Sequence, residues 1–333
     1  MKVVVVGASG NIGSALLREL ASGGDHDVVG VARRKPTVSG ESALASVHWQ
    51  AADVARDDLD GIVASADVVV HLGWMFQPTR RPAVTWCTNA VGSRRVLEAV
   101  GRQGVGAVVC ASSVAAYSPV DHDEPLDEGW RTDGASEAAY AREKAYVERV
   151  LDAFEAAHPE IRVVRMRPAF VFQRSAASEQ RRIFGGPLAR PSFLDPGRIP
   201  LLPVPHGLRL QTVHAGDVAR AFSAAVERPV AGAFNIAADD ILRREQLGEL
   251  LGARTFEVPV GAARAALAAA WKTRLAPVPP ELFDALVHLP VMATHRARQE
   301  LDWMPSHSAA DALGSFFAGA HQRAGSTMPP LHP

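Results

Sequence analysis

Near its start the chain reads Val3-Val4-Val5-Val6-Gly7-Ala8-Ser9-Gly10-Asn11-Ile12-Gly13, and this stretch decides the fold. Four consecutive β-branched residues favour a strand buried on both faces of a parallel sheet. The glycines that follow let the backbone approach a pyrophosphate, and a helix starting near Asn11 directs its free N–H groups at that phosphate. The spacing is G-x-x-G-x-x-G rather than the commoner G-x-G-x-x-G, and a plain strand–turn–helix would look similar. We predict a dinucleotide site at this turn.

The composition limits the class of protein. The 333 residues can bury a sizeable core, and 47% of them are apolar. Lys and Arg total 35 against 36 Asp and Glu, so neither nucleic acid nor an anionic membrane is expected as a partner. With no C-x-x-C motif, Cys87 and Cys110 are expected to be reduced core thiols. The 12 histidines show no H-E-x-x-H spacing, so no metal site is expected.

Targeting signals are not apparent in the sequence. Lys2 precedes only a short apolar run before Gly7, which is too short for the core of a signal peptide. The Ala-rich stretch 261–271 contains Arg264 and therefore does not read as a membrane span. We expect a soluble, cytoplasmic protein.

Strand-like and helix-like segments alternate through the first half of the chain. This alternation predicts an α/β fold with a doubly wound parallel sheet of the Rossmann type. Ligands of such sheets bind beyond the carboxyl ends of the strands. The expected strands are Val3–Val6, Val28–Val31, Asp67–His71, Ala107–Ala111 and Ile161–Met166, and the helical patterns are Val84–Val100 and Ala135–Ala157.

The composition changes after Phe172. Residues 173–207 are rich in Pro, Arg and Gly and show no sustained period, which is typical of a substrate loop or lid, or else of a disordered insertion. We therefore expect residues 1–172 to form the dinucleotide-binding domain, with 208–237 returning to it. Residues 173–207 and 238–333 are expected to form a smaller, helix-rich substrate region.

Two motifs after the glycine turn carry chemistry. Tyr140 and Lys144 are four residues apart within a helical pattern, so they share one helix face. A nearby ammonium would lower the pKa of the tyrosine toward neutrality, which suits an acid/base for an alcohol and carbonyl pair. Ser113 lies at the end of the fourth strand, where its hydroxyl could hold a substrate oxygen. An exposed helix pair and a serine capping a turn are the alternatives.

In this order and spacing, Gly7/Gly10/Gly13, Ser113, Tyr140 and Lys144 resemble the extended short-chain dehydrogenase/reductase family, also called the NAD-dependent epimerase/dehydratase family. The resemblance spans nearly the whole chain. Its other landmarks are Asp53-Val54, His71-Leu72-Gly73, Asn89-Ala90-Val91-Gly92-Ser93, Arg167-Pro168-Ala169-Phe170-Val171, Val213-His214-Ala215-Gly216-Asp217-Val218-Ala219, Phe234-Asn235-Ile236 and Leu301-Asp302-Trp303-Met304-Pro305.

The resemblance implies a role for each of the matching residues. Tyr140 would be the acid/base, Lys144 would bond the nicotinamide ribose and lower the tyrosine pKa, and Ser113 would hold the reacting oxygen. Asn89 would organise its helix or a proton-relay water. Members of the family are often dimers through two helices. The residues expected to bind the cofactor are Gly7, Ser9, Gly10, Asn11, Ile12, Gly13, Arg33, Arg34, Asp53, Val54, Leu72, Gly73, Asn89, Tyr140, Lys144 and Pro168.

The end of the second strand bears on the choice of cofactor. In NAD enzymes an acid about twenty residues beyond the glycine turn binds the ribose hydroxyls. Here Ala32 stands at that position and is followed by Arg33, Arg34 and Lys35. Guanidinium groups suit a 2′-phosphate, so we predict NADP, with NAD the less favoured cofactor; a solvated basic turn is the alternative.

Departures from the sugar-nucleotide branches of the family favour a less charged substrate. Val114-Ala115 replaces the Asp-Glu pair of the 4,6-dehydratases, Phe170 stands where an Asn is common, and Leu210 stands where a diphosphate-binding Arg is common. The adjacent Arg209 could compensate. The residues expected near the substrate are Ser113, Trp74, Met75 and Phe170, with Phe76 and Phe172 in the same apolar wall or in ordinary core packing.

The leading prediction is an NADP-dependent oxidoreductase that acts on a carbonyl or secondary alcohol of a small, partly apolar molecule. The alternative within enzymes is a sugar-nucleotide epimerase or dehydratase with a retained cofactor. A dinucleotide-sensing regulator without catalysis is the alternative from another class, and the joint presence of Ser113, Tyr140 and Lys144 argues against it.

Overall fold

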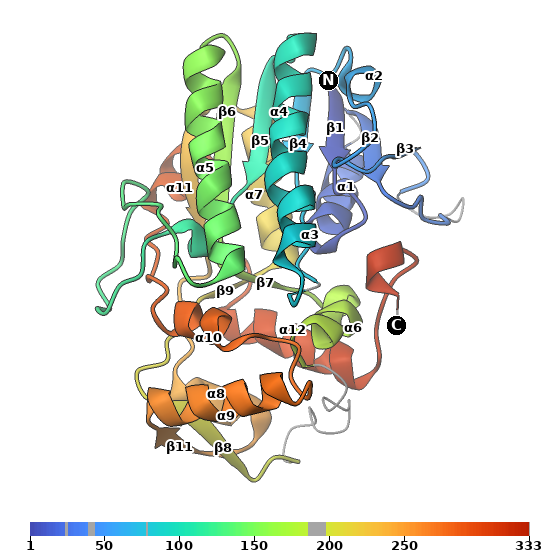
Figure 1. The fold of residues 1–333 in the computed structure, drawn as a ribbon. Coiled ribbons are helices and arrows are strands. Elements are labelled where there is room, and N and C mark those ends of the chain that lie inside the picture. The colour runs from blue at the N-terminus through green and yellow to red at the C-terminus, as the bar shows by residue number, and fades with distance from the viewer. Residues whose placement is uncertain (24–25, 39–43, 78, 186–197, 333) are drawn as a thin grey trace.

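A parallel sheet of seven strands is the centre of the computed structural model, which describes residues 1–23, 26–38, 44–77, 79–185 and 198–332 (Figure 1). The strand order reverses between β1 and β4, and this switch point is where open α/β sheets bind ligands. The sheet runs in the order β10 (Gly232–Ile236), β6 (Arg162–Pro168), β5 (Ala107–Ala111), β4 (Val68–His71), β1 (Lys2–Val6), β2 (Asp27–Ala32) and β3 (His48–Ala51).

Alternating burial explains the valine run of β1. Val3 and Val5 belong to the core on one face of the sheet, and Val4 and Val6 belong to the core on the other. The first core lies beneath α1 (Asn11–Gly23) and α7 (Ala215–Glu227), which pack against each other. The second core lies beneath α4 (Gly92–Gln103) and α5 (Ala139–Ala157), the two long helices in front of the sheet in Figure 1.

A π-helical turn, Cys87–Val91, joins α3 (Pro82–Trp86) to α4. Such turns widen the backbone by one residue and are frequent at functional sites. Here the turn buries Asn89 completely, with its side chain 0% exposed.

The short sheets and most of the remaining helices lie below the carboxyl ends of the central strands (Figure 1). Strand β7 (Phe170–Phe172) pairs with β9 (Thr212–His214), and β8 (Leu201–Pro205) pairs with β11 (Arg254–Val258). The helices there are α6 (Ala177–Gln180), α8 (Arg244–Leu251), α9 (Val260–Lys272), α10 (Pro280–Val287) and α12 (Ala309–His321), while α2 (Asp60–Val63) and α11 (His295–Glu300) lie at the sides of the central sheet (Figure 1).

The expected doubly wound α/β fold is confirmed. All five expected strands occur. The sheet adds two that the list of apolar runs did not contain, β3, whose burial is incomplete, and the edge strand β10, which the sequence marked only by the landmark Phe234-Asn235-Ile236. The segment 173–207 is more regular than expected, since short helical turns span 174–185 and β8 begins at Leu201. Its residues 186–197 lie outside the described part of the chain. No helix among the described residues has the length and apolar character needed to cross a membrane.

Candidate active site

Two cavities open at the switch point and meet there. A groove of about 140 Å³ runs across the ends of β1, β2 and β4, and a larger cavity of about 570 Å³ continues toward α9 and α10. Both are lined by the glycine turn and by the loop after β4. The residues that they share are Gly7, Gly10, Leu72, Gly73, Trp74 and Glu179.

The glycine turn fits a dinucleotide. Gly7 has φ +85°, and a side chain there would place its Cβ 2.6 Å from the Gly73 nitrogen. The protein itself therefore requires Gly7. Gly10 is different, because a Cβ there would meet only the Gly7 carbonyl oxygen, at 3.4 Å, while the position faces the groove. Packing does not require this glycine, so its bare Cα leaves room for a close ligand, and α1 begins beside it at Asn11 with its free N–H groups.

Where β2 ends, the groove is lined by two arginines, and no carboxylate stands at the last position of the strand. Ala32, Arg33 and Arg34 line it, and both arginines are exposed. Asp53 and Val54, which follow the neighbouring strand β3, line it as well. The side chain of Asp53 accepts a hydrogen bond from the Ala55 N–H at 3.0 Å. The groove therefore offers guanidinium groups where the cofactor type is expected to be read.

Ser113, Tyr140 and Lys144 come together in the large cavity, where the cavity meets the groove. Ser113 caps a short 3-10 turn, and its Oγ accepts from the Ala115 N–H at 3.2 Å. Tyr140 lies in the first turn of α5, and Lys144 follows one turn later. The Lys144 ammonium is buried, donates to the Ala111 carbonyl oxygen at 2.9 Å, and lies 3.5 Å from the centroid of the Trp74 ring.

The pKa values differ from the sequence expectation. Burial raises the pKa of Tyr140, and the hydrogen bond with Ser113 opposes that shift only in part. Burial also lowers the pKa of Lys144 to about 7, against the attraction of Cys110, Glu148 and Glu143. The expected depression of the tyrosine pKa by Lys144 is therefore wrong for this state. The ammonium faces Ala111 and Trp74 and lies 6.0 Å from the centroid of the tyrosine ring.

Aromatic side chains enclose Tyr140. The Trp74 ring lies edge-on to it with centroids 5.8 Å apart, and the Phe76 ring lies 5.3 Å away. Phe76 in turn contacts Phe184, at 5.0 Å. These contacts remove water from the phenol and explain why burial dominates its pKa.

The far wall of the large cavity is apolar and comes from β7, from the segment after it and from the C-terminal helices. Helices α9 and α10 contribute several of its side chains. The apolar residues of this wall are Phe170, Val171, Phe172, Ile183, Phe184, Leu267, Val278, Leu282, Phe283, Leu286 and Leu289. Glu179 and Gln180 add polar groups at the edge.

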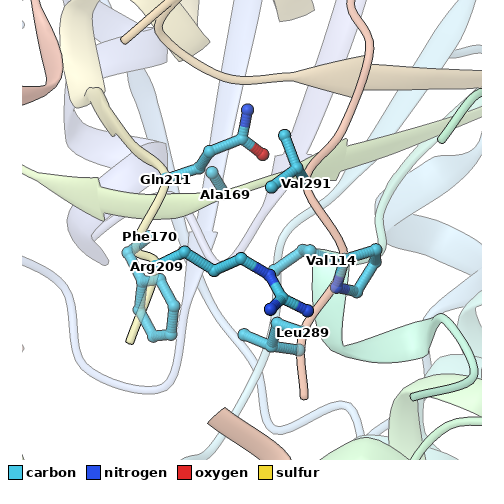
Figure 2. Close-up of a pocket in the computed structure, with 8 residues that line it drawn as sticks. Val114, Ala169, Phe170, Arg209, Gln211, Leu289 and Val291 are labelled. Carbon is cyan, nitrogen blue, oxygen red and sulfur yellow. The ribbon is translucent and has the colours of Figure 1, made fainter. Parts of the chain in front are cut away.

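One arginine lies beside this wall. Arg209, whose side chain is 9% exposed, pairs with Asp123 at 3.1 Å, and its Nε has no hydrogen-bond partner. Figure 2 shows its guanidinium beside Leu289 and Val114. These three residues and Phe170 line a small cavity of about 10 Å³. Val114, Phe170 and Leu289 line the large cavity as well.

A buried ion pair fixes the strands behind the site. The Glu148 carboxylate of α5 is 0% exposed and accepts from Arg167 Nε at 2.8 Å and from Ser112 Oγ at 2.6 Å. Arg165 also pairs with it, at 3.1 Å. Burial disfavours the charge, but the bonds and charges of Arg167, Ser112 and Arg165 lower the Glu148 pKa to about 2. The group thus anchors α5, which carries Tyr140 and Lys144, to β5 and β6.

Most residues expected at the site line one of the two cavities. Two do not lie where expected. Met75 lines the groove and not the substrate cavity, and Asn89 lines neither, because its side chain bonds to the Met75 backbone and to Glu143. The expected residues that line the groove or the large cavity are Gly7, Ser9, Gly10, Asn11, Ile12, Gly13, Arg33, Arg34, Asp53, Val54, Leu72, Gly73, Trp74, Ser113, Tyr140, Lys144, Pro168 and Phe170.

Several residues of the site escaped the sequence argument. Glu179 and Thr88 line the groove, as do Pro329 and Pro330 of the C-terminal segment, and none stands in a family landmark. The apolar residues of α10 had a signal, because Leu282 and Leu286 recur at helical spacing. The sequence also held a signal for Glu143, because a carboxylate directly before Lys144 is expected to raise the pKa of the lysine.

The comparisons with known proteins agree with this geometry. The model of the NAD dependent epimerase/dehydratase family matches residues 3–237. An uncharacterized protein of Mycobacterium tuberculosis is 28% identical over 266 residues, 78% of this chain and 24% of that protein. The chain thus spans about a quarter of the length of the first curated relatives it matches. The UDP-glucose 4-epimerase of Pisum sativum is 24% identical over 225 residues, 61% of this chain and 63% of that protein.

Solved structures share the fold. The UDP-glucose 4-epimerase of Stenotrophomonas maltophila, with bound NAD and formylated UDP-arabinopyranose, aligns with TM-score 0.73 and 19% identity over 97% of this chain and 98% of that one. The UDP-glucuronic acid 4-epimerase of Bacillus cereus, with NAD, aligns with TM-score 0.68 and 16% identity over 97% and 99%. The resemblance seen in the motifs is confirmed. The chain belongs to the NAD dependent epimerase/dehydratase family.

Proposed function

We propose that this protein transfers a hydride between a nicotinamide dinucleotide and the carbon of a carbonyl or secondary alcohol. The observation that carries the proposal is that Ser113, Tyr140 and Lys144 meet where the groove joins the large cavity. A dinucleotide in the groove would place its nicotinamide end at this junction. When bound, the cofactor supplies or accepts the hydride.

In the proposed mechanism Tyr140 is the acid/base. During reduction its phenol donates a proton to the carbonyl oxygen while the carbon gains the hydride, and the product is an alcohol. Ser113 would donate a hydrogen bond to the same oxygen, and Lys144 would hold the nicotinamide ribose. The raised pKa of Tyr140 keeps the phenol protonated at neutral pH, which is the state that reduction needs.

For the substrate, we propose a molecule with a large apolar part and one reacting oxygen. The wall formed by α9, α10 and the segment after β7 is apolar, while the hydroxyls of Ser113 and Tyr140 lie at its inner end. Burial of apolar surface drives binding there, and the few polar groups orient the reacting carbon. In this proposal residues 1–172 and 208–237 bind the dinucleotide, and 173–207 and 238–333 bind the substrate.

For the cofactor, we propose NADP. Arg33 and Arg34 line the groove, and Ala32 leaves no carboxylate to accept the ribose hydroxyls or to repel a 2′-phosphate. The solved structures that share the fold carry NAD, and the family is named for it. A preference for NAD is therefore the outcome that would count against this part of the proposal.

A sugar-nucleotide epimerase is the second candidate, and one observation favours it. Arg209 has an Nε without a partner and lies beside the far wall of the cavity, where a diphosphate would need a cation. Structural neighbours with UDP-sugars add weight. The surroundings of the guanidinium argue the other way, since the other residues that line this cavity are apolar except Gln211, whose amide already bonds to the Met292 backbone.

One experiment separates these functions. The protein is mixed with NADPH or NADH and a panel of phenyl-substituted ketones such as 4-phenyl-2-butanone, and dinucleotide oxidation is followed by its absorbance. In parallel, UDP-glucose and UDP-glucuronic acid are incubated with NAD, and inversion at C4 is followed by NMR. Net oxidation with a ketone supports the first proposal. Inverted sugar without net oxidation overturns it in favour of the epimerase, and dinucleotide binding with neither reaction points to a sensor.

A further inference from the structure

Glu143 is a buried carboxylate within the Tyr-x-x-x-Lys motif that the proposed mechanism does not use. Its side chain lies on α5 between Tyr140 and Lys144, and the residue is 3% exposed. No cation pairs with it at salt-bridge distance among the described residues. It instead accepts two short hydrogen bonds from neutral groups, the Thr85 hydroxyl and the Asn89 amide, each 2.6 Å long.

The bond to Asn89 fixes which way the asparagine amide points. Asn89 Nδ2 donates to Glu143 Oε2 at 2.6 Å and to the Met75 carbonyl oxygen at 2.8 Å, and Oδ1 accepts from the Met75 N–H at 2.7 Å. A carboxylate only accepts, so it selects the amide orientation that presents Nδ2 to it. In that orientation both polar groups of the Met75 backbone are satisfied. The flipped amide would turn Oδ1 toward the Glu143 carboxylate and the Met75 carbonyl oxygen, and Nδ2 toward the Met75 N–H, so none of the three bonds could form.

Met75 is the residue between the two aromatic side chains that enclose Tyr140. Trp74 lies over the Lys144 ammonium at 3.5 Å and edge-on to Tyr140 at 5.8 Å, and Phe76 lies 5.3 Å from Tyr140. A shift of the Met75 backbone would therefore move both aromatic contacts at once. The contacts therefore connect Glu143, through Asn89 and the Met75 backbone, to Trp74 and Phe76, which pack against Tyr140 and Lys144 of the same helix α5.

We propose that Glu143 is a positioning residue of this active site, whose carboxylate orients Asn89, thereby fixes the Met75 backbone, and so sets Trp74 and Phe76 against Tyr140 and Lys144. The proposal rests on the proposed function only for the roles of Tyr140 and Lys144. The contacts themselves hold for any reaction at this site.

The charge of Glu143 adds an electrostatic consequence. It raises the pKa of Lys144 and of Tyr140, although burial is the larger influence on both. Lys144 also faces the Cys110 thiol of β5, the His71 imidazole of β4 and Glu148 of α5. Glu143 itself faces Thr85 and Asn89 across the helix interface, and Arg142 and Lys144 on its own helix.

Three variants separate position from charge. Glu143→Ala removes the acceptor and releases Asn89. Glu143→Gln keeps an acceptor for Asn89, and its new amide can donate to Thr85, because the Thr85 hydroxyl has the Pro82 carbonyl oxygen 3.0 Å away as another acceptor. Thr85→Val is the matched control, since it removes one bond to the same carboxylate and leaves Asn89 held.

The first measurement is hydrogen exchange of the Met75 amide, read by NMR without any ligand. We expect exchange at least tenfold faster in Glu143→Ala, and within threefold of the parent in Glu143→Gln and Thr85→Val. Only the first variant removes the side-chain oxygen of residue 143 that holds the Asn89 amide. Unchanged Met75 protection in Glu143→Ala would overturn the proposal, as would equal acceleration in the control. If Glu143→Ala does not fold, Glu143→Asp takes its place, since its shorter side chain withdraws from Asn89.

The second measurement is the dissociation constant of NADPH between pH 6 and pH 9. Glu143→Gln keeps the geometry and removes the charge, so the pH at which binding weakens is expected to fall by roughly half a unit or more. If Glu143 had a purely structural role, that pH would be unchanged in Glu143→Gln. This result would refute the electrostatic part of the proposal. If neither NADPH nor NADH binds to the parent at any pH, the proposed function fails, while the Met75 exchange still decides the role of Glu143.

Discussion

The Lys144 ammonium lies 3.5 Å from the centroid of the Trp74 ring, and Trp74 lines both the groove and the cavity while Lys144 lines the cavity. The indole face stabilises the cation that burial disfavours. Burial nevertheless lowers the pKa of Lys144 to about 7, so the ammonium and the neutral amine are about equally populated near neutral pH. Any step that needs this ammonium should be sensitive to pH and to Trp74.

Trp74→Leu tests that dependence. Leucine keeps the site apolar but removes the ring face, so the pKa of Lys144 should fall further and dinucleotide binding at pH 8 should weaken about threefold to thirtyfold, the range of one desolvated cation–π contact. The same affinity should fall in the parent as pH rises through about 7. Titration calorimetry at pH 6 and pH 8 measures both effects. Equal weakening at the two pH values would show a packing loss rather than a loss of charge.

Tyr140→Phe tests the acid/base. Without the phenol the proton must come from water, and turnover of a ketone that the parent reduces should fall roughly 10²–10⁴-fold, the usual range for general acid–base catalysis. Cofactor affinity should change less than about threefold, because the ring and its contacts with Trp74 and Phe76 remain. Steady-state kinetics and cofactor titration provide the two values. Near-normal turnover would remove Tyr140 from the mechanism.

Arg33→Ala combined with Arg34→Ala tests cofactor choice. Each charge-assisted contact to a 2′-phosphate contributes roughly 1.5–3 kcal/mol, so NADP binding should weaken at least about tenfold while NAD binding stays nearly unchanged. Ala32→Asp should shift the preference further toward NAD by repelling the phosphate. Dissociation constants of both dinucleotides check this. A parent that prefers NAD would show that the basic turn is only a solvated surface.

Glu148→Ala tests the anchor behind the site. It leaves the buried Arg165 and Arg167 without their shared carboxylate, and the free energy of unfolding should drop by about 3–5 kcal/mol at pH 7. The exposed pair of Arg102 and Asp60 is the control, and Asp60→Ala should change stability far less.

The pH dependence gives the same anchor a second test. The Glu148 pKa is about 2 in the folded chain and below its ordinary value. The charge of Glu148 therefore stabilises the folded state fully above the ordinary glutamate pKa of about 4.3. This contribution is lost as pH falls through about 2. The difference between parent and Glu148→Ala in urea unfolding should shrink between pH 4 and pH 2. A constant difference would show that packing rather than charge accounts for it.

The sequence predicted the parts of the site whose geometry is local. A valine run followed by spaced glycines specifies a buried strand, a tight turn and a helix, so Gly7 and Gly10 could be placed without any tertiary information. Tyr140 and Lys144 share a helix face because the helical period alone puts residues four apart on one side. The family landmarks extended this to Ser113.

Contacts between distant segments could not be predicted in the same way. Glu143 and Asn89 are 54 positions apart, and their bond joins α5 to the π-helical turn Cys87–Val91, which only the packing of the two segments brings together. The apolar wall from α9 and α10 depends on how the C-terminal helices pack below the sheet. The Tyr140 pKa was predicted with the wrong direction because a motif shows which charge is near in sequence, but not how much water is excluded.

The amino-acid sequence by itself determined the doubly wound sheet, the glycine turn and the shared face of Tyr140 and Lys144, because strand, turn and helix periods are encoded over a few neighbouring residues. Only the tertiary structure decided where the Lys144 ammonium points, which carboxylate orients Asn89, and which helices close the cavity. Those features arise from packing between segments far apart in the chain. Desolvation, which sets the charge of Lys144 and Tyr140, exists only once that packing has formed.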